Sequence, residues 1–199
     1  MHYPDHIVFV KHGDKYNHKH VNRLFEQCFL YWPDAKYFCY TENKKGINAA
    51  VNIIPIGKPS LKLWWNKLSM FREDFPVKGK CLYFDLDMDI QKDPYELITW
   101  DGLTVINAYW KRDMFMRKHA YDVRINSSII TWESKQQRHI WEHFMTNRDY
   151  FMRKYKGIDR FLVHENFDVN TFDDGIVNSV ANENIEAPIQ MYNGIDYEL

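Results

Sequence analysis

Residues 80–90 read Lys80-Cys81-Leu82-Tyr83-Phe84-Asp85-Leu86-Asp87-Met88-Asp89-Ile90, an apolar strand that runs directly into three alternating aspartates. Side chains of an extended strand alternate between two faces, so Asp85, Asp87 and Asp89 are expected on the same face. Three like charges there repel one another and are costly to desolvate without a counter-charge. A divalent cation such as Mg²⁺ or Mn²⁺ supplies one. The stretch predicts a metal-assisted site for a phosphorylated donor; the alternative is carboxylates that cap a helix or are solvated.

Apolar runs typical of strands alternate with segments of helical spacing along most of the chain. The predicted strands are 7–10, 36–41, 52–56, 81–84, 104–109 and 125–132, and the predicted helices are 20–32, 61–75, 136–155 and a segment from 157 to 164. This order favours a doubly wound α/β sheet, with 52–56 at an edge because Pro55 cannot donate to a strand ladder. Ligands of such sheets bind beyond the carboxyl ends of strands, where Gly13, Thr41 and Asp85 fall.

Composition narrows the class of protein. The 199 residues are 45% hydrophobic and 17% aromatic, which favours one folded domain with a substantial core. A formal net charge of -1 gives no general attraction to nucleic acid or anionic membranes. The three cysteines, Cys28, Cys39 and Cys81, lie in apolar segments and are expected to be buried free thiols. No signal peptide or membrane span is recognisable, so we expect a cytoplasmic protein.

Several short motifs occur in the order found in one enzyme family. They are Lys11-x-Gly13-x-x-Tyr16, Val21-Asn22-Arg23-Leu24, Thr41-Glu42, Trp64-Trp65-Asn66-Lys67-Leu68, the Asp85-Leu86-Asp87 pair, Asn126-Ser127-Ser128 and Gly157-Ile158-Asp159-Arg160. Over residues 5–165 the chain resembles GT-A fold glycosyltransferases, in particular the small retaining enzymes of glycosyltransferase family 8. The resemblance implies a single α/β domain with a central mixed, mostly parallel sheet flanked by helices. Its nucleotide-binding half would be about 1–95, its acceptor half about 96–165, and its tail 166–199 irregular.

The resemblance also implies a nucleotide-sugar donor, usually a UDP-sugar, bound with Mn²⁺ or Mg²⁺. Asp85 and Asp87, with Leu86 between them, would hold the metal and diphosphate, Asp85 on the side of the ribose and sugar and Asp87 on the metal. The other donor-binding residues implied are Lys11, Gly13, Tyr16, Thr41, Glu42 and Lys67. Of these, Tyr16 would stack on uracil; alternatively, it only packs against its neighbours.

By the same resemblance, Lys67, Asn126 and Asp159 would serve catalysis around the sugar and the acceptor. Two alternatives stay open: Lys67 extends to solvent along its helix, and Asp159 caps a helix. The family usually has Gln where this chain has Arg160, and no histidine follows residue 165 to complete the metal site. His164, Asp89 or water would then be the third ligand.

These features predict a metal-dependent transfer of a hexose from a UDP-sugar to an unknown acceptor, with retention implied by the family alone. One alternative is another metal-dependent phosphoryl-transfer enzyme, such as a nucleotidyltransferase. Another is a non-catalytic module that binds nucleotide sugars.

Overall fold

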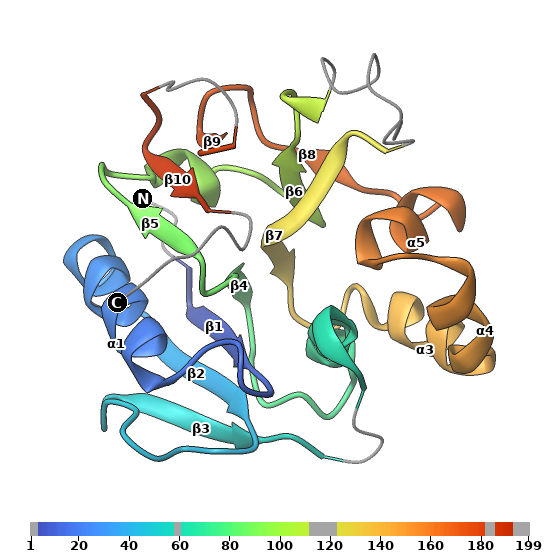
Figure 1. Ribbon diagram of the computed structural model, residues 1–199, viewed down its shortest axis with the longest axis horizontal. Coiled ribbons are helices and arrows are strands. Elements are labelled where there is room, and N and C mark those ends of the chain that lie inside the picture. The colour runs from blue at the N-terminus through green and yellow to red at the C-terminus, as the bar shows by residue number, and fades with distance from the viewer. Residues whose placement is uncertain (1–3, 58–60, 112–122, 182–185, 193–199) are drawn as a thin grey trace.

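The computed structural model describes residues 4–57, 61–111, 123–181 and 186–192. A seven-stranded sheet in the order β3-β2-β1-β4-β7-β6-β8 forms its centre (Figure 1). Its strands are β1 (His6–Lys11), β2 (Lys36–Thr41), β3 (Val51–Pro55), β4 (Lys80–Phe84), β6 (Thr104–Asn107), β7 (Ile125–Glu133) and β8 (Asn170–Thr171). Strands β1 to β4 pair in parallel, β7 runs antiparallel to β4 and β6, and β8 pairs in parallel with β6. The sheet is therefore mixed, as the sequence predicted, with β3 at an edge.

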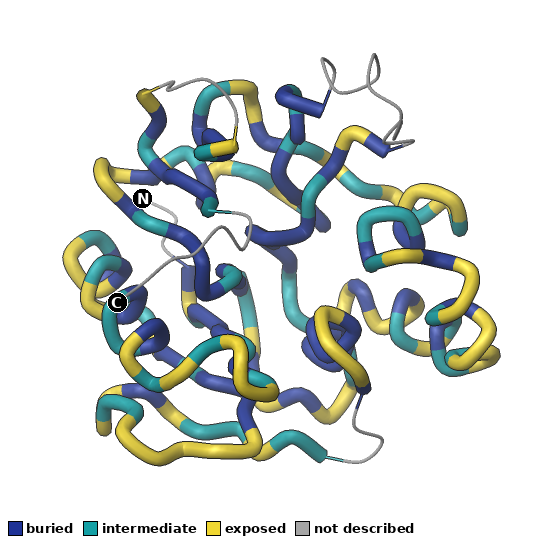
Figure 2. Tube along the Cα trace, in the orientation of Figure 1, coloured by how far each residue is buried: buried dark blue, intermediate teal, exposed yellow. Residues whose placement is uncertain are grey.

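Helices cover both faces of the sheet. They are α1 (His18–Tyr31), α3 (Arg138–Thr146), α4 (Arg148–Lys154), α5 (Ile158–His164) and the 3₁₀ helices η1 (Leu63–Phe71) and η2 (Tyr95–Ile98). Strand β1 shows the division: Ile7 and Phe9 pack into the core beneath α1, whereas Val8 packs into the core shared with η1, α3 and α5. The central strands β1 and β4 are accordingly buried on both sides, whereas the edge strand β3 is partly exposed (Figure 2).

Helix boundaries follow local sequence signals. Asn17 caps α1, since its Oδ1 accepts from the Lys19 backbone N–H at 2.9 Å and the His20 ring completes a capping box. The three cysteines are buried free thiols, as predicted, and burial raises the pKa of each. No helix in the described ranges is both long enough and apolar enough to cross a membrane.

Three predicted elements differ from the structure. Of the segment 61–75, only Leu63–Phe71 is helical, and it forms the 3₁₀ helix η1, at whose start Asn66 Nδ2 donates to the carbonyls of Leu61 and Leu63. The helix predicted for 136–155 is two helices, broken at Asn147 with φ −152° and ψ 53°.

The described part of the tail, 166–181 and 186–192, contains three short strands where the sequence predicted irregular structure. It supplies β8 to the main sheet, while β9 (Val177–Ser179) and β10 (Ile189–Met191) form a second, small sheet with β5 (Met88–Ile90). The pairs that form these strands are far apart in sequence, for example Asn170 with Thr104, and local patterns do not reveal such pairs.

Gly79 directly precedes the central strand β4, and its replacement is expected to destabilise the fold. Its φ is +76°, and an added Cβ would lie 2.2 Å from Asp5 Oδ2, the atom that accepts from the Lys80 backbone N–H. Gly175 is a matched control, with φ +95° and open space around its Cβ position. In urea denaturation we expect Gly79→Ala to cost about 1–2 kcal/mol more than Gly175→Ala. Equal losses would show that Asp5 moves aside freely.

Glu165 ties the last three helices together and makes stability depend on pH. Burial acts to raise the pKa of its carboxyl, but hydrogen bonds from Tyr155, His143 and Lys154 outweigh it and lower the pKa to about 2. The folded-state pKa is below the unfolded value, so this stabilisation is present above pH ~4.5 and is lost as the pH falls towards 2.

We expect Glu165→Gln to lower the free energy of unfolding by about 1–2 kcal/mol at pH 7, and the difference from wild type to vanish near pH 2. Denaturation curves recorded from pH 2 to 7 measure it. Glu142→Gln is the control, since Glu142 forms an exposed pair with Arg138, and the substitution should change stability little. A pH-independent loss in Glu165→Gln would contradict the role of the charge.

Candidate active site

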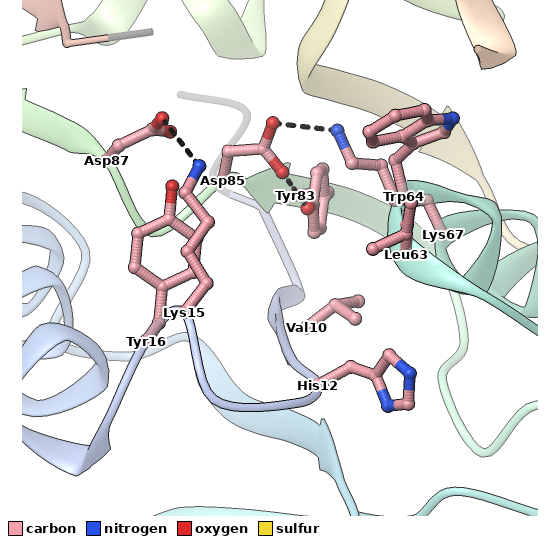
Figure 3. Close-up of a pocket in the computed structure, with 10 residues that line it drawn as sticks. All are labelled: Val10, His12, Lys15, Tyr16, Leu63, Trp64, Lys67, Tyr83, Asp85 and Asp87. Carbon is pink, nitrogen blue, oxygen red and sulfur yellow. Dashed lines mark hydrogen bonds and ion pairs between the residues drawn. The ribbon is translucent and has the colours of Figure 1, made fainter. Parts of the chain in front are cut away.

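A pocket lies beyond the carboxyl ends of β1 and β4, where the sequence placed the ligand (Figure 3). Its lining comes from the end of β1 and the loop after it, from η1, and from the end of β4 and the turn after it. The lining residues are Val10, His12, Lys15, Tyr16, Leu63, Trp64, Lys67, Tyr83, Asp85 and Asp87. Four of the predicted site residues therefore meet in one pocket: Tyr16, Lys67, Asp85 and Asp87.

Asp85 directly follows β4 and is held from three directions. Its Oδ2 accepts from Lys67 Nζ at 2.7 Å, and its Oδ1 accepts from the Tyr83 hydroxyl. Its backbone N–H donates to the Ser128 carbonyl at 2.7 Å, which fixes the main chain against β7. Burial, and next the charge of Asp85, raise the pKa of Tyr83, so this phenol stays a hydrogen-bond donor.

Asp87 approaches the same pocket from its other side and is only 7% exposed. Lys15 Nζ lies 4.0 Å from Asp87 Oδ2 and 4.5 Å from the centre of the Tyr16 ring. Burial raises the pKa of Tyr16, and the charge of Asp87 and a hydrogen bond to it raise the pKa further. The two aspartates are thus each paired with a lysine and a tyrosine, and they face one pocket (Figure 3).

Asp89 does not join them, which corrects the expectation of three aspartates on one face. The chain turns at Leu86 and Asp87 before β5 begins, so the strand alternation ends after Asp85. In β5, the Asp89 carboxylate accepts from Gln27 Nε2 and lies 3.7 Å from Arg23 Nη1, both on α1. Asp89 therefore anchors α1 to the small sheet and is not a third ligand in the pocket.

Lys67 and Asp159 meet at one residue of β7, Ser127. Lys67 Nζ donates to the Ser127 carbonyl at 3.2 Å, and Asp159 Oδ1 accepts from the Ser127 backbone N–H at 2.9 Å. Lys67 is buried and paired, so the alternative in which it extends to solvent is wrong. Gly157 holds the N-cap position of α5, so the alternative in which Asp159 caps that helix is also wrong. Lys111 Nζ, 3.5 Å from Asp159 Oδ2, is a second cation there that sequence reasoning missed.

Asn126 stands beside this junction. Its Oδ1 accepts from the Ser128 backbone N–H at 2.8 Å, and Ser128 in turn accepts from Asp85. Asn126 and Asp159 do not line the pocket. Ser128 links Asn126 to Asp85 through backbone hydrogen bonds, and Ser127 links Asp159 to Lys67 in the same way. All three predicted catalytic residues are thus brought together at the start of β7.

The remaining predicted donor contacts are Lys11, Gly13, Thr41, Glu42 and Leu86, which are not among the residues that line the pocket. The Gly13 backbone N–H donates to Glu42 Oε1 at 2.7 Å, which links the loops after β1 and β2. Burial raises the pKa of Glu42, but hydrogen bonds from its own N–H and that of Gly13 outweigh it, and the pKa is lowered overall. Thr41 bonds to the Asn43 backbone, while Lys11 and Leu86 are buried. None of these five lines the pocket, and their contacts with a donor stay predictions.

The structure does not support His164 as a metal ligand. It is exposed at the end of α5, and its ring stacks on Tyr155 at 5.8 Å, so it packs towards α4. Within the described ranges, no three His, Cys, Asp or Glu side chains gather closely enough to hold a metal. What remains is Asp85 and Asp87, a pair of hard oxygen donors that fits a cation sharing its other positions with water and a diphosphate.

The sequence analysis missed several residues that line the pocket. Of these, only Tyr83 could have been predicted from the sequence. Tyr83 and Asp85 are two apart in a strand, so alternation alone would have placed the phenol beside the carboxylate. Lys15 is next to Tyr16 in the sequence, but no spacing or motif links it to Asp85 or Asp87, so its place beside Asp87 could not be predicted. Leu63 and Trp64 were expected within an apolar helix, not at a pocket.

Solved glycosyltransferases share this architecture. The galactosyltransferase LgtC, in complex with donor and acceptor sugar analogs, matches with a TM-score of 0.69 at 13% identity, over 94% of this chain and 87% of LgtC. GlyE of Streptococcus pneumoniae TIGR4 matches with a TM-score of 0.62 at 13% identity, over 86% of this chain and 46% of GlyE. No protein-family model matches the sequence, and no curated protein does. At this identity the likeness concerns the fold: the chain has the GT-A fold of these glycosyltransferases, as its sequence predicted.

Proposed function

We propose that this protein is a metal-dependent glycosyltransferase that takes a hexose from a UDP-sugar and transfers it to an acceptor hydroxyl. The observation that carries the proposal is the pair Asp85 and Asp87, two carboxylates in one pocket, each beside a lysine. The pocket offers negative charge for a cation and positive charge for phosphates within a few ångströms. That combination suits a metal-bound diphosphate better than a neutral ligand.

In this proposal Asp85 and Asp87 hold Mn²⁺ or Mg²⁺, which neutralises the charge that develops on the departing diphosphate. Lys67, already positioned by Asp85 and Ser127, reaches the phosphate or the sugar from one side, and Lys15 reaches the phosphates from the other. Asp159 and Asn126 act as positioning residues, because each holds the backbone to which Lys67 or Asp85 is bonded. Retention of the anomeric configuration rests on the family resemblance.

Calorimetry of UDP with and without Mn²⁺ tests the proposal, followed by a screen of UDP-sugars for slow hydrolysis. Metal-dependent binding of UDP together with release of one sugar supports a glycosyltransferase. Binding without hydrolysis or transfer would instead indicate a binding module, and no binding of UDP would remove the main support for the function.

A further inference from the structure

A second cavity lies at the start of β4, at the opposite end of that strand from Asp85. Its walls are the start of β4, the segment 100–102 that precedes β6, the end of β7, where the pairing of β6 with β7 ends, and Gln136. No described residue lines both this cavity and the pocket of Asp85 and Asp87. Because each strand residue advances the chain by about 3.3 Å, the five residues of β4 put the two sites roughly 15 Å apart. The second cavity is therefore a separate site.

The size of the second cavity limits what it can hold. Its volume is about 180 Å³. One buried water needs roughly 10–15 Å³, whereas pockets for drug-sized ligands have volumes of about 300–1,000 Å³. The cavity is therefore larger than one water requires and smaller than a drug-sized molecule requires. It fits a metabolite of a few non-hydrogen atoms.

Two side chains in the wall of this cavity have buried polar atoms without a partner. Thr131 is 2% exposed, and neither its hydroxyl nor the buried Trp100 Nε1 has a hydrogen-bond partner among the described residues. The neighbouring hydroxyl on β6 is engaged, since Thr104 Oγ1 donates to the Asp101 carbonyl at 3.2 Å. Burying a polar group without a hydrogen bond is costly, so such groups are normally satisfied by water or by a ligand.

A carboxylate lies on the same wall. Glu133 and Thr131 are alternate residues of β7, so their side chains lie on one face of the sheet. Glu133 forms no ion pair with another described residue, although Lys80 is its neighbour on β4. Lys80 Nζ instead donates to the Ile98 carbonyl at 3.1 Å and lies 3.7 Å from Asp101 Oδ1. The cavity therefore offers one carboxylate without a paired cation beside two hydrogen-bond donors without an acceptor.

We propose that this cavity binds a small primary amine whose neighbouring carbon bears an oxygen, the chemistry that amino acids and amino alcohols share. The ammonium lies against Glu133, and the oxygen accepts from the Thr131 hydroxyl and the Trp100 indole N–H. An anion without an amine is repelled by Glu133, and an amine without an oxygen leaves both donors unpaired. The site is independent of the proposed function, so either can fail without the other.

The indole N–H signals of the seven tryptophans in a proton–nitrogen correlation spectrum test the proposal. Trp100→Phe identifies the signal of Trp100. We expect millimolar alanine or ethanolamine to move that signal downfield, because its N–H gains an acceptor, and the tighter binder of the two identifies the class of ligand. Methylamine and acetate each carry only one of the two groups and should leave the signal in place. If neither alanine nor ethanolamine moves it, or if methylamine or acetate moves it as far, the proposal is wrong.

Two substitutions in the wall of the cavity test the contacts one at a time. Thr131→Val keeps the shape of the side chain, and Glu133→Gln removes the charge; each should weaken binding about tenfold. Because the Thr131 hydroxyl has no partner to lose, Thr131→Val should not lower the thermal unfolding temperature. Glu142→Gln, at an exposed carboxylate outside the cavity, is the control and should bind normally. Normal binding by both wall variants, or a lower unfolding temperature for Thr131→Val, would contradict the proposal.

Discussion

Asp87→Asn is expected to weaken Mn²⁺-dependent binding of UDP by about 100-fold or more, the largest effect on the donor site that one substitution should produce. The amide keeps the shape of the side chain and can still accept from Tyr16, so the fold should be retained. It removes the negative charge, however, and with it one of the two hard anionic ligands. Calorimetry of UDP at fixed Mn²⁺, with thermal unfolding as a check on folding, measures the effect.

Asp89→Asn is the matched control, because it changes the same residue type two positions further along the same acidic run. Its carboxylate contacts Gln27 and Arg23 on α1 and not the pocket. We expect UDP binding to remain within about twofold of wild type, with a stability loss of about 1 kcal/mol. If both variants lose UDP binding equally, or neither does, Asp87 has no special role and the donor site lies elsewhere.

This pair of variants also marks the limit of the sequence argument. The apolar run from Cys81 to Phe84 correctly predicted the buried strand β4, and the resemblance selected Asp85 and Asp87. Alternation failed for Asp89, since it assumes that the strand continues, and the turn at Leu86 and Asp87 is set by pairing of β5 with the distant β10. Such long-range pairing leaves no local pattern.

The same reason accounts for the other differences. Continuous apolar runs located the strands β1, β2 and β4, because strands that are buried on both faces carry apolar residues at successive positions. The sequence pattern could not predict that Trp64 is exposed and Trp65 is buried, since the two residues are adjacent and identical. The backbone conformation that Asn66 holds directs Trp64 outward and Trp65 into the core. Likewise, the role of Lys67 depends on Asp85 and Ser127, which lie 18 and 60 residues away.

Lys67→Met is expected to affect both stability and turnover. The lysine is buried and pairs with Asp85 at 2.7 Å, so its removal leaves a partly buried carboxylate with the Tyr83 hydroxyl but no counter-charge. Breaking such a pair from one side costs about 3 kcal/mol. Loss of a cation at the leaving diphosphate should also lower transfer or UDP-sugar hydrolysis by roughly 100- to 1,000-fold. Urea denaturation and a hydrolysis assay measure the two effects.

A double-mutant cycle with Asp85→Asn distinguishes the ion pair from general disturbance of η1. Once both charges are removed, no uncompensated charge is left, so Lys67→Met in the Asp85→Asn background should cost about 2 kcal/mol less than in the wild type. Lys80→Met is the control for removing a partly buried lysine outside the pocket: its Nζ donates to the Ile98 carbonyl, and the Asp101 carboxylate that it approaches is fully exposed. It should cost about 1 kcal/mol and leave turnover intact. Additive losses in the cycle would mean that Lys67 stabilises η1 by packing, and Asp85 would then keep its place in the donor site without Lys67 as its partner.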